Sequence, residues 1–304
     1  MAKSKNRTNR PTVPKQPFGR HDLVGWLIML PTLVLFAFFV WEPLLESIRL
    51  SLYSAKGIEL VKFVGLDNYR DVLAHPTFMP ALKNTFVYIF WSLIIGYCTP
   101  IIMALFISET VHLKGFFRIG VYIPNVVPGI ATVFIWRYFF YAGNKGVLNI
   151  LLDKIGVEPV SWLNIAPLTI PIIVLAVTWR NAGATTLIYI AAISNVNSEL
   201  VEAATIDGAG ILRRIRHVTL PSILPLAKTM LILQMIAVFQ IYYEPLVLTN
   251  GGPNKASYSI MQLVYDFAFT DFKFPRASAI SVMVCIILII LTGIYMKLTK
   301  SKEE

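Results

Sequence analysis

The chain has 304 residues, of which 56% are hydrophobic and only 14% are charged. Soluble globular domains have about 25% charged residues, so this composition excludes an ordinary soluble domain and predicts an integral membrane protein. The net charge of +10 does not indicate a nucleic-acid-binding face, because the basic residues lie at the ends of apolar runs. Cys98 and Cys285 lie within apolar runs and predict neither a disulfide framework nor a metal site.

The amino-terminal segment 1–22 is basic and precedes an uncharged run at residues 23–41. A cleaved signal peptide has a shorter apolar core that ends in small residues, whereas this run ends in Phe38, Phe39, Val40 and Trp41. We therefore expect an uncleaved first membrane span, preceded by a cytoplasmic tail.

Five further apolar runs follow, and each is long enough to cross a bilayer. Pro100 is expected to kink the second run, and Pro124 and Pro128 lie inside the third. Between the first two runs, residues 42–83 contain five acidic and five basic residues, which indicates an external loop with one or two interfacial helices. The six predicted spans are about 23–41, 84–107, 119–140, 168–192, 220–242 and 277–296.

One polar stretch interrupts the apolar pattern between the fourth and fifth spans. Residues 198–206 are predicted to form a helix capped by Ser198, and the turn 207–210 contains two glycines that end it. A second short helix is expected at 211–217, followed by Pro221 in the first turn of the next span. The segment 193–219 is thus predicted to be a cytoplasmic helix–turn–helix loop.

The distribution of basic residues predicts that both termini lie in the cytoplasm. The cytoplasmic tracts and the carboxyl tail at 298–304 would contain fourteen of the 27 basic residues, and the external loops eleven. The bias is mild overall, but six basic residues in the amino-terminal tail have few acids near them. An even number of spans agrees with this orientation.

The polar stretch also contains a recognisable motif: Glu202-Ala203-Ala204, then Gly208, then Val218-x-Leu220-Pro221. It resembles the EAA loop of ABC-importer membrane subunits, although that family usually has isoleucine where Val218 stands. Residues 63–69 and 248–253 resemble the carbohydrate-uptake branch, of the maltose, glycerol-phosphate and multiple-sugar type. Without the family, the same stretch reads as an amphipathic connector between two spans.

The resemblance implies an all-α integral membrane protein with six transmembrane helices (residues 23–297) and a cytoplasmic EAA coupling-helix loop. It implies that the chain is the permease subunit of an importer in the prokaryotic inner membrane. A sugar or oligosaccharide would arrive on an extracytoplasmic binding protein and cross by alternating access. The implied partners are a second homologous permease and two cytoplasmic ATPase subunits. The residues that would dock into the ATPase are Glu202, Ala203, Ala204, Asp207 and Gly208.

The sequence contains no nucleophile–base pair, metal-ligand cluster or glycine-rich phosphate-binding loop. We therefore expect the chain not to be an enzyme and to bind no cofactor, with ATP hydrolysed by a separate chain. Two other classes remain as alternatives. A stand-alone secondary carrier would need buried acids inside the spans, and a multi-span membrane enzyme would need a catalytic set; neither is found between the predicted span ends.

Polar side chains inside the spans are costly in hydrocarbon and tend to face a cavity or another helix. In the maltose-importer type of permease, which the chain resembles, sugar contacts come from the fourth and fifth of these spans. Glutamine and threonine side chains also hold membrane helices together, which is the alternative interpretation. The residues expected to contact substrate are Arg180, Asn181, Gln234, Gln240 and Tyr242.

Overall fold

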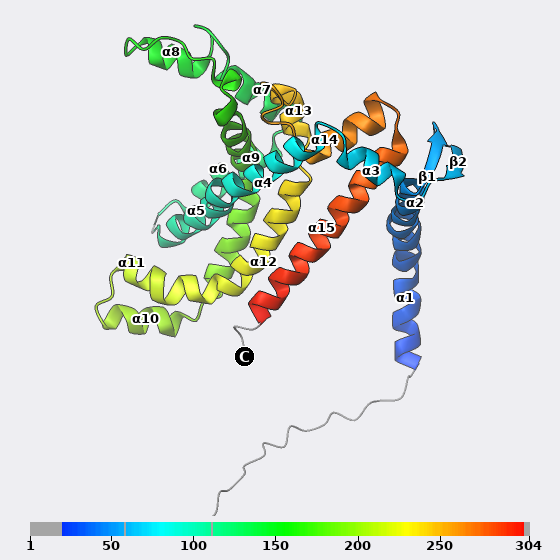
Figure 1. Ribbon diagram of the computed structural model, residues 1–304. Helices are drawn as coiled ribbons and strands as arrows, with labels where there is room; N and C mark the ends of the chain where they lie inside the picture. Colours follow the sequence, from blue (N-terminus) through cyan, green and yellow to red (C-terminus); the bar gives the residue numbers. More distant parts are fainter. Residues whose placement is uncertain (1–19, 58, 111, 301–304) are drawn as a thin grey trace, which may run out of the picture. The chain divides into compact units, whose positions relative to one another are not determined.

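The computed structural model describes residues 20–57, 59–110 and 112–300 (Figure 1). The chain divides into two compact units, residues 1–49 and 50–304, which are treated separately below. The predicted cytoplasmic tails fall largely outside the described residues, since these begin at Arg20 and end at Lys300.

In the described residues, the first unit is one apolar helix. It consists of α1 (Arg20–Phe36), the π turn η1 (Ala37–Trp41) and most of α2 (Glu42–Ser51). The helix continues beyond the predicted span end at Trp41, so that Leu23–Ser51 forms 29 residues that are apolar enough to cross a membrane.

The second unit opens with a β-hairpin that the sequence did not predict. Strands β1 (Tyr53–Lys56) and β2 (Glu59–Phe63) pair antiparallel with an irregularity at Ser54/Ala55, and they are the only strands among the described residues. The short helix α3 (Asp67–Leu73) follows. Its Asn68 amide donates to the carbonyl oxygens of Ser51 and Tyr53, both at 2.9 Å, and so fixes the start of the hairpin.

The second predicted span is one helix of 32 residues, Phe78–Glu109. It comprises α4 (Phe78–Trp91), the π turn η2 (Ser92–Tyr97) and α5 (Cys98–Glu109). The ring of Pro100 would clash with the carbonyl four residues earlier, at Gly96, in a regular α-helix. The wider π turn lies at that carbonyl and lets the helix pass the proline.

The third predicted span is not one helix. It consists of α6 (Lys114–Val126) and α7 (Gly129–Phe139), which meet at an angle of 97°. Pro128 disfavours a helical conformation at Val127, which is extended (φ −66°, ψ 128°). The short helices α8 (Val147–Asp153) and η3 (Trp162–Asn164) follow this broken pair.

The predicted helix–turn–helix loop is present, with two corrections. Helix α10 (Ser198–Ile206) has the predicted bounds, but its cap is Asn197 and not Ser198, since the Asn197 side chain accepts from the Glu199 amide at 2.9 Å. The second helix is not separate. Helix α11 (Ile211–Arg214), the π turn η4 (Ile215–Thr219) and α12 (Leu220–Phe239) form one continuous helix, Ile211–Phe239. The π turn again precedes a proline, Pro221.

The rest of the second unit is also helical. The long helix α9 spans Ala166–Ser194, between η3 and the loop. After α12 come α13 (Tyr243–Thr249), α14 (Ile260–Tyr265), the π turn η5 (Asp266–Thr270) and α15 (Phe274–Lys300). Figure 1 places α10 and α11 at one end of this unit and α8 at the opposite end.

In the described part of the chain, five helices are long and apolar enough to cross a membrane, or six if α6 and α7 count as one span. Six is the predicted number, and the prediction of an all-α membrane protein is confirmed apart from the small hairpin.

Helix α9 is the centre of the second unit, and it contacts α4, α5, α6, α7, α12 and α13. It contributes to both buried apolar clusters, through Ile173 in one and Tyr189 in the other. Its closest neighbour is the backbone of α6: a Cβ atom added at Gly183 would lie 1.9 Å from the Val121 carbonyl oxygen. The absence of a side chain at Gly183 therefore sets the distance between the two helices.

We predict that Gly183→Ala lowers the thermal unfolding midpoint of the detergent-solubilised protein. Overpacking costs about 1–3 kcal/mol, and the clash here is with backbone that cannot rotate away. The matched control is Gly120→Ala on α6, where an added Cβ meets nothing within 4 Å. That control should be neutral or slightly stabilising, because alanine favours helix over glycine. Equal losses in both variants would contradict the close approach of α6 and α9.

Candidate functional site

A cavity of about 200 Å³ lies where the helices of the second unit that carry the predicted substrate residues meet. Its lining comes mainly from α9 and α12, with one residue from η2 and one from α13. Three of the five predicted substrate residues, Asn181, Gln234 and Gln240, line it together. The full lining is Gly96, Val177, Thr178, Asn181, Ala182, Thr185, Gln234, Ala237, Val238, Gln240, Ile241 and Glu244.

The polar part of the α9 wall follows the helical repeat. Thr178, Asn181 and Thr185 are three and four residues apart, which places them on one face of the helix. Other positions of α9 are apolar and packed, as at Ile173 and Ala176, whereas Arg180 lies off the cavity face. The cavity side of α9 therefore presents two hydroxyl groups and one amide group.

Gln234 contributes to the cavity and also joins two helices. Its amide nitrogen donates to the Ser92 hydroxyl of η2 at 2.6 Å. Gly96 makes this approach possible, since a Cβ atom there would lie 2.8 Å from the Gln234 amide nitrogen and 3.3 Å from the Thr178 hydroxyl. Both interpretations of this glutamine, helix contact and cavity lining, thus describe the same side chain. Gln240 ends α12 and has no side-chain hydrogen bond among the described residues.

Glu244 is a cavity residue that sequence reasoning missed. It lies in the first turn of α13, two residues beyond the predicted end of the fifth span. Burial raises the pKa of its carboxyl above the usual value, and its own backbone amide and the Arg180 guanidinium act in the opposite direction. The sequence did contain a signal, because Glu244 is the first acidic residue after Asp207.

Arg180 and Tyr242 do not line this cavity. The Arg180 guanidinium lies against Gly129 at the start of α7, where an added Cβ atom would be 3.2 Å from its Nη1 atom. Its Nε atom is buried without a hydrogen-bond partner in the described part of the chain. The Tyr242 ring stacks on Tyr265 with a centroid separation of 5.7 Å.

The predicted docking residues lie on the hairpin formed by α10 and α11. Its turn is a Schellman motif, in which the Ala209 amide donates to the Ala204 carbonyl and the Gly208 amide to the Thr205 carbonyl. Gly208 has a φ of +76°, which explains glycine at this position. The turn therefore fixes the angle at which the chain leaves α10.

The hairpin exposes both polar and apolar groups. Glu202, Ala203, Asp207 and Gly208 are exposed, and Ala204 is half-buried. Ile206 is 86% exposed and Leu212 is 80% exposed. Large apolar side chains exposed together on a polar loop are typical of a protein-binding surface.

No group of three or more His, Cys, Asp or Glu residues in the described ranges could hold a metal ion. The cavity offers neutral hydrogen-bonding groups and one carboxyl group, that of Glu244, whereas the hairpin offers an amphipathic surface.

The profile of the family described as "Binding-protein-dependent transport system inner membrane component" matches residues 96–300. The chain is 31% identical to the probable ABC transporter permease protein YurN of Bacillus subtilis, over 94% of this chain and 99% of that protein. It is also 31% identical to the arabinooligosaccharides transport system permease protein AraP of the same organism, over 91% and 88%.

Among solved structures, the fold is similar to a bacterial ABC transporter involved in the import of the acidic polysaccharide alginate. The TM-score is 0.82 at 23% identity, over 93% of this chain and 96% of that one. The matched family profile extends over more than half of the chain, from the π turn at the cavity through the hairpin to the end of α15. The chain therefore belongs to the family of inner membrane components of binding-protein-dependent transport systems.

Proposed function

We propose that this chain is the membrane-spanning permease subunit of an ATP-binding-cassette importer for a sugar or oligosaccharide. The observation that carries the proposal is the polar cavity between α9 and α12 in an otherwise apolar bundle. The substrate would arrive on an extracytoplasmic binding protein and cross by alternating access, driven by a separate ATPase. Membership of a binding-protein-dependent family argues against the stand-alone secondary carrier.

The chemistry of the cavity suits sugar hydroxyls. Asn181 and Gln240 offer amide donors and acceptors, and Thr178 and Thr185 offer hydroxyl groups. The relative AraP is named for arabinooligosaccharides, which is consistent with this class of substrate. Because Glu244 lines the cavity and Arg180 does not, we favour an uncharged sugar over an acidic one.

We predict that Asn181→Ala weakens transport without affecting assembly. A neutral hydrogen bond contributes about 0.5–1.5 kcal/mol, so the sugar concentration for half-maximal uptake should rise about 2- to 10-fold. Ser194→Ala is the matched control, because Ser194 lies on the same helix and its hydroxyl donates to the Ile190 carbonyl at 2.8 Å, away from the cavity. Unchanged uptake in the Asn181 variant would remove this residue from the site.

The α10–α11 hairpin is the proposed contact with the ATPase. The Glu202 carboxylate has no ion pair within the described part of the chain and lies beside exposed Ala203. Ile206 and Leu212 add exposed apolar side chains to the same hairpin. An exposed surface of this composition fits a cleft on a soluble protein.

Glu202→Lys should leave the chain in the membrane at its normal level while reducing sugar-dependent ATP hydrolysis and uptake. Reversal of a charge at an interface centre costs 2 kcal/mol or more at typical hot spots, so we expect at least about a tenfold loss. Glu59→Lys on the β-hairpin reverses an exposed charge elsewhere and serves as the control. Normal uptake with normal ATPase stimulation in Glu202→Lys would exclude the docking role.

A second, different permease is the proposed neighbour in the membrane. One copy of this chain supplies one hairpin and one wall of a transport path, whereas an ATPase dimer has two clefts to fill. We predict that co-expression with the ATPase and binding protein alone gives no sugar uptake, and that adding the second permease restores it. Uptake without that subunit would indicate a homodimer instead.

The proposed orientation places the hairpin in the cytoplasm. Helix α15 ends at the same end of the second unit as α10 and α11, so the carboxyl terminus would lie on that side (Figure 1). The six basic residues among residues 1–20 favour a cytoplasmic amino terminus as well.

A further inference from the structure

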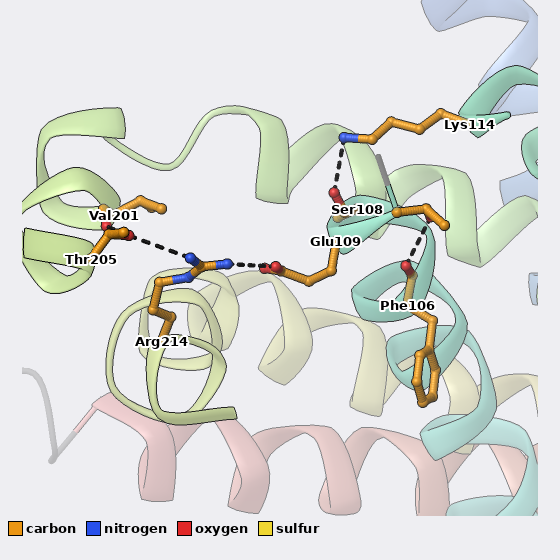
Figure 2. Close-up of polar contacts among 8 residues, drawn as sticks. Phe106, Ser108, Glu109, Lys114, Val201, Thr205 and Arg214 are labelled. Carbon is orange, nitrogen blue, oxygen red and sulfur yellow. Dashed lines mark hydrogen bonds and ion pairs between the residues drawn. The ribbon is translucent and has the colours of Figure 1, made fainter. Parts of the chain in front are cut away.

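The α10–α11 hairpin is fastened to the end of α5 by a charged contact between distant parts of the sequence (Figure 2). The Arg214 Nη2 atom of α11 lies 2.7 Å from the Glu109 Oε2 atom at the last residue of α5. The Arg214 Nη1 atom also donates to the Thr205 hydroxyl of α10 at 3.3 Å. One guanidinium group thus joins both helices of the hairpin to the second predicted span.

This ion pair is more sheltered than the others in the described residues. The Arg214 and Glu109 side chains are 20% and 28% exposed, and the remaining pairs join side chains of which at least one is about half exposed or more. The Arg214 Nε atom is buried and has no hydrogen-bond partner among the described residues, so this part of the guanidinium is shielded from water. A sheltered pair is screened less by salt and fixes geometry better than an exposed one.

Glu109 occupies a position that a helix alone would disfavour. A carboxylate in the last turn lies at the negative end of the helix dipole, where cations are preferred. The free carbonyls at this end are instead bound by Lys114, which donates to the Ser108 carbonyl at 3.0 Å (Figure 2), and by the Thr110 hydroxyl. Glu109 is therefore left to bind Arg214, which compensates for its unfavourable position.

The ion pair is the outermost of three polar contacts between the same two helices, Phe78–Glu109 and Ile211–Phe239. In the middle, the Tyr97 hydroxyl donates to the Ala227 carbonyl at 2.8 Å. At the cavity, Gln234 donates to Ser92 at 2.6 Å. Side-chain contacts at three levels hold the two helices in one register over most of the length of α5 and α12.

We infer that Glu109 and Arg214 are positioning residues that make these two helices move together when the hairpin moves. The hairpin is continuous with α12, so its displacement reaches Gln234 through the backbone. It reaches Gly96, which lines the cavity from η2, through the ion pair and α5 as well as through the contacts that Ala227 and Gln234 make with η2. This inference rests on the proposed function, because it assumes that the ATPase displaces the hairpin.

The test uses the assembled importer, purified through a tag on this chain, in proteoliposomes with its binding protein and sugar. We expect Arg214→Gln to assemble and to hydrolyse ATP, but to import at least about threefold less sugar per ATP hydrolysed. The double variant Glu109→Arg/Arg214→Glu restores the pair with reversed polarity and should recover most of the ratio. Arg213→Gln removes the same charge from the same helix turn and should leave the ratio unchanged, because Arg213 is exposed and has no ion pair among the described residues.

A wild-type sugar-to-ATP ratio in Arg214→Gln would overturn the inference. An equal loss in Arg213→Gln would also overturn it, by assigning the effect to the net charge of the hairpin. If Arg214→Gln does not assemble, Glu109→Gln is measured in the same way, and failure of both to assemble would make the pair purely structural. Failure of the proposed function itself is distinct, since the wild-type complex would then show no sugar-dependent ATP hydrolysis.

Discussion

The structure depends on one constraint, that polar groups in an apolar bundle must bind one another or line a cavity. Threonine and serine hydroxyls bind within their own helix, as Thr186 does by donating to the Ala182 carbonyl at 2.7 Å. Longer side chains form hydrogen bonds between helices, as Gln234 does with Ser92. Asn181, Gln240 and Glu244 are among those that remain, and they line one cavity between α9 and α12, whereas Arg180 lies apart from it against Gly129.

The helical architecture could be predicted from the sequence because apolar runs of bilayer length are a strong signal, but prolines were harder to interpret. Pro43, Pro100 and Pro221 each follow a π turn, and the helix continues through all three. Pro128 instead follows an extended Val127, and the chain bends by 97°. The sequence shows where each proline stands but not whether the backbone before it widens into a π turn or becomes extended, so these two outcomes could not be distinguished in advance.

The candidate site was predicted in part, and helical geometry explains which part. Asn181 shares a face with Thr178 and Thr185, whereas Arg180 is rotated by about 100° and reaches Gly129 instead. Arg180 and Asn181 lie at the same depth in the span, so depth alone selects both. The 3.6-residue repeat of the helix places them on different faces, and only one of those faces lines the cavity. Glu244 was missed because it lies beyond the apolar run, in the first turn of the short helix α13. Its position could not be obtained from periodicity within one span.

The contacts between the helices Phe78–Glu109 and Ile211–Phe239 follow the cost of burying charge. The two contacts within the apolar part use neutral groups, a hydroxyl with a backbone carbonyl and an amide with a hydroxyl. The charged contact, between Arg214 and Glu109, lies at the helix end, where the side chains remain 20% and 28% exposed. Desolvating an ion pair fully would offset much of its attraction, and exposing it fully would leave it weak. An intermediate depth gives a contact that is directional and still reversible. Such a contact can join a moving loop to a membrane helix without adding an unpaired charge to the bilayer.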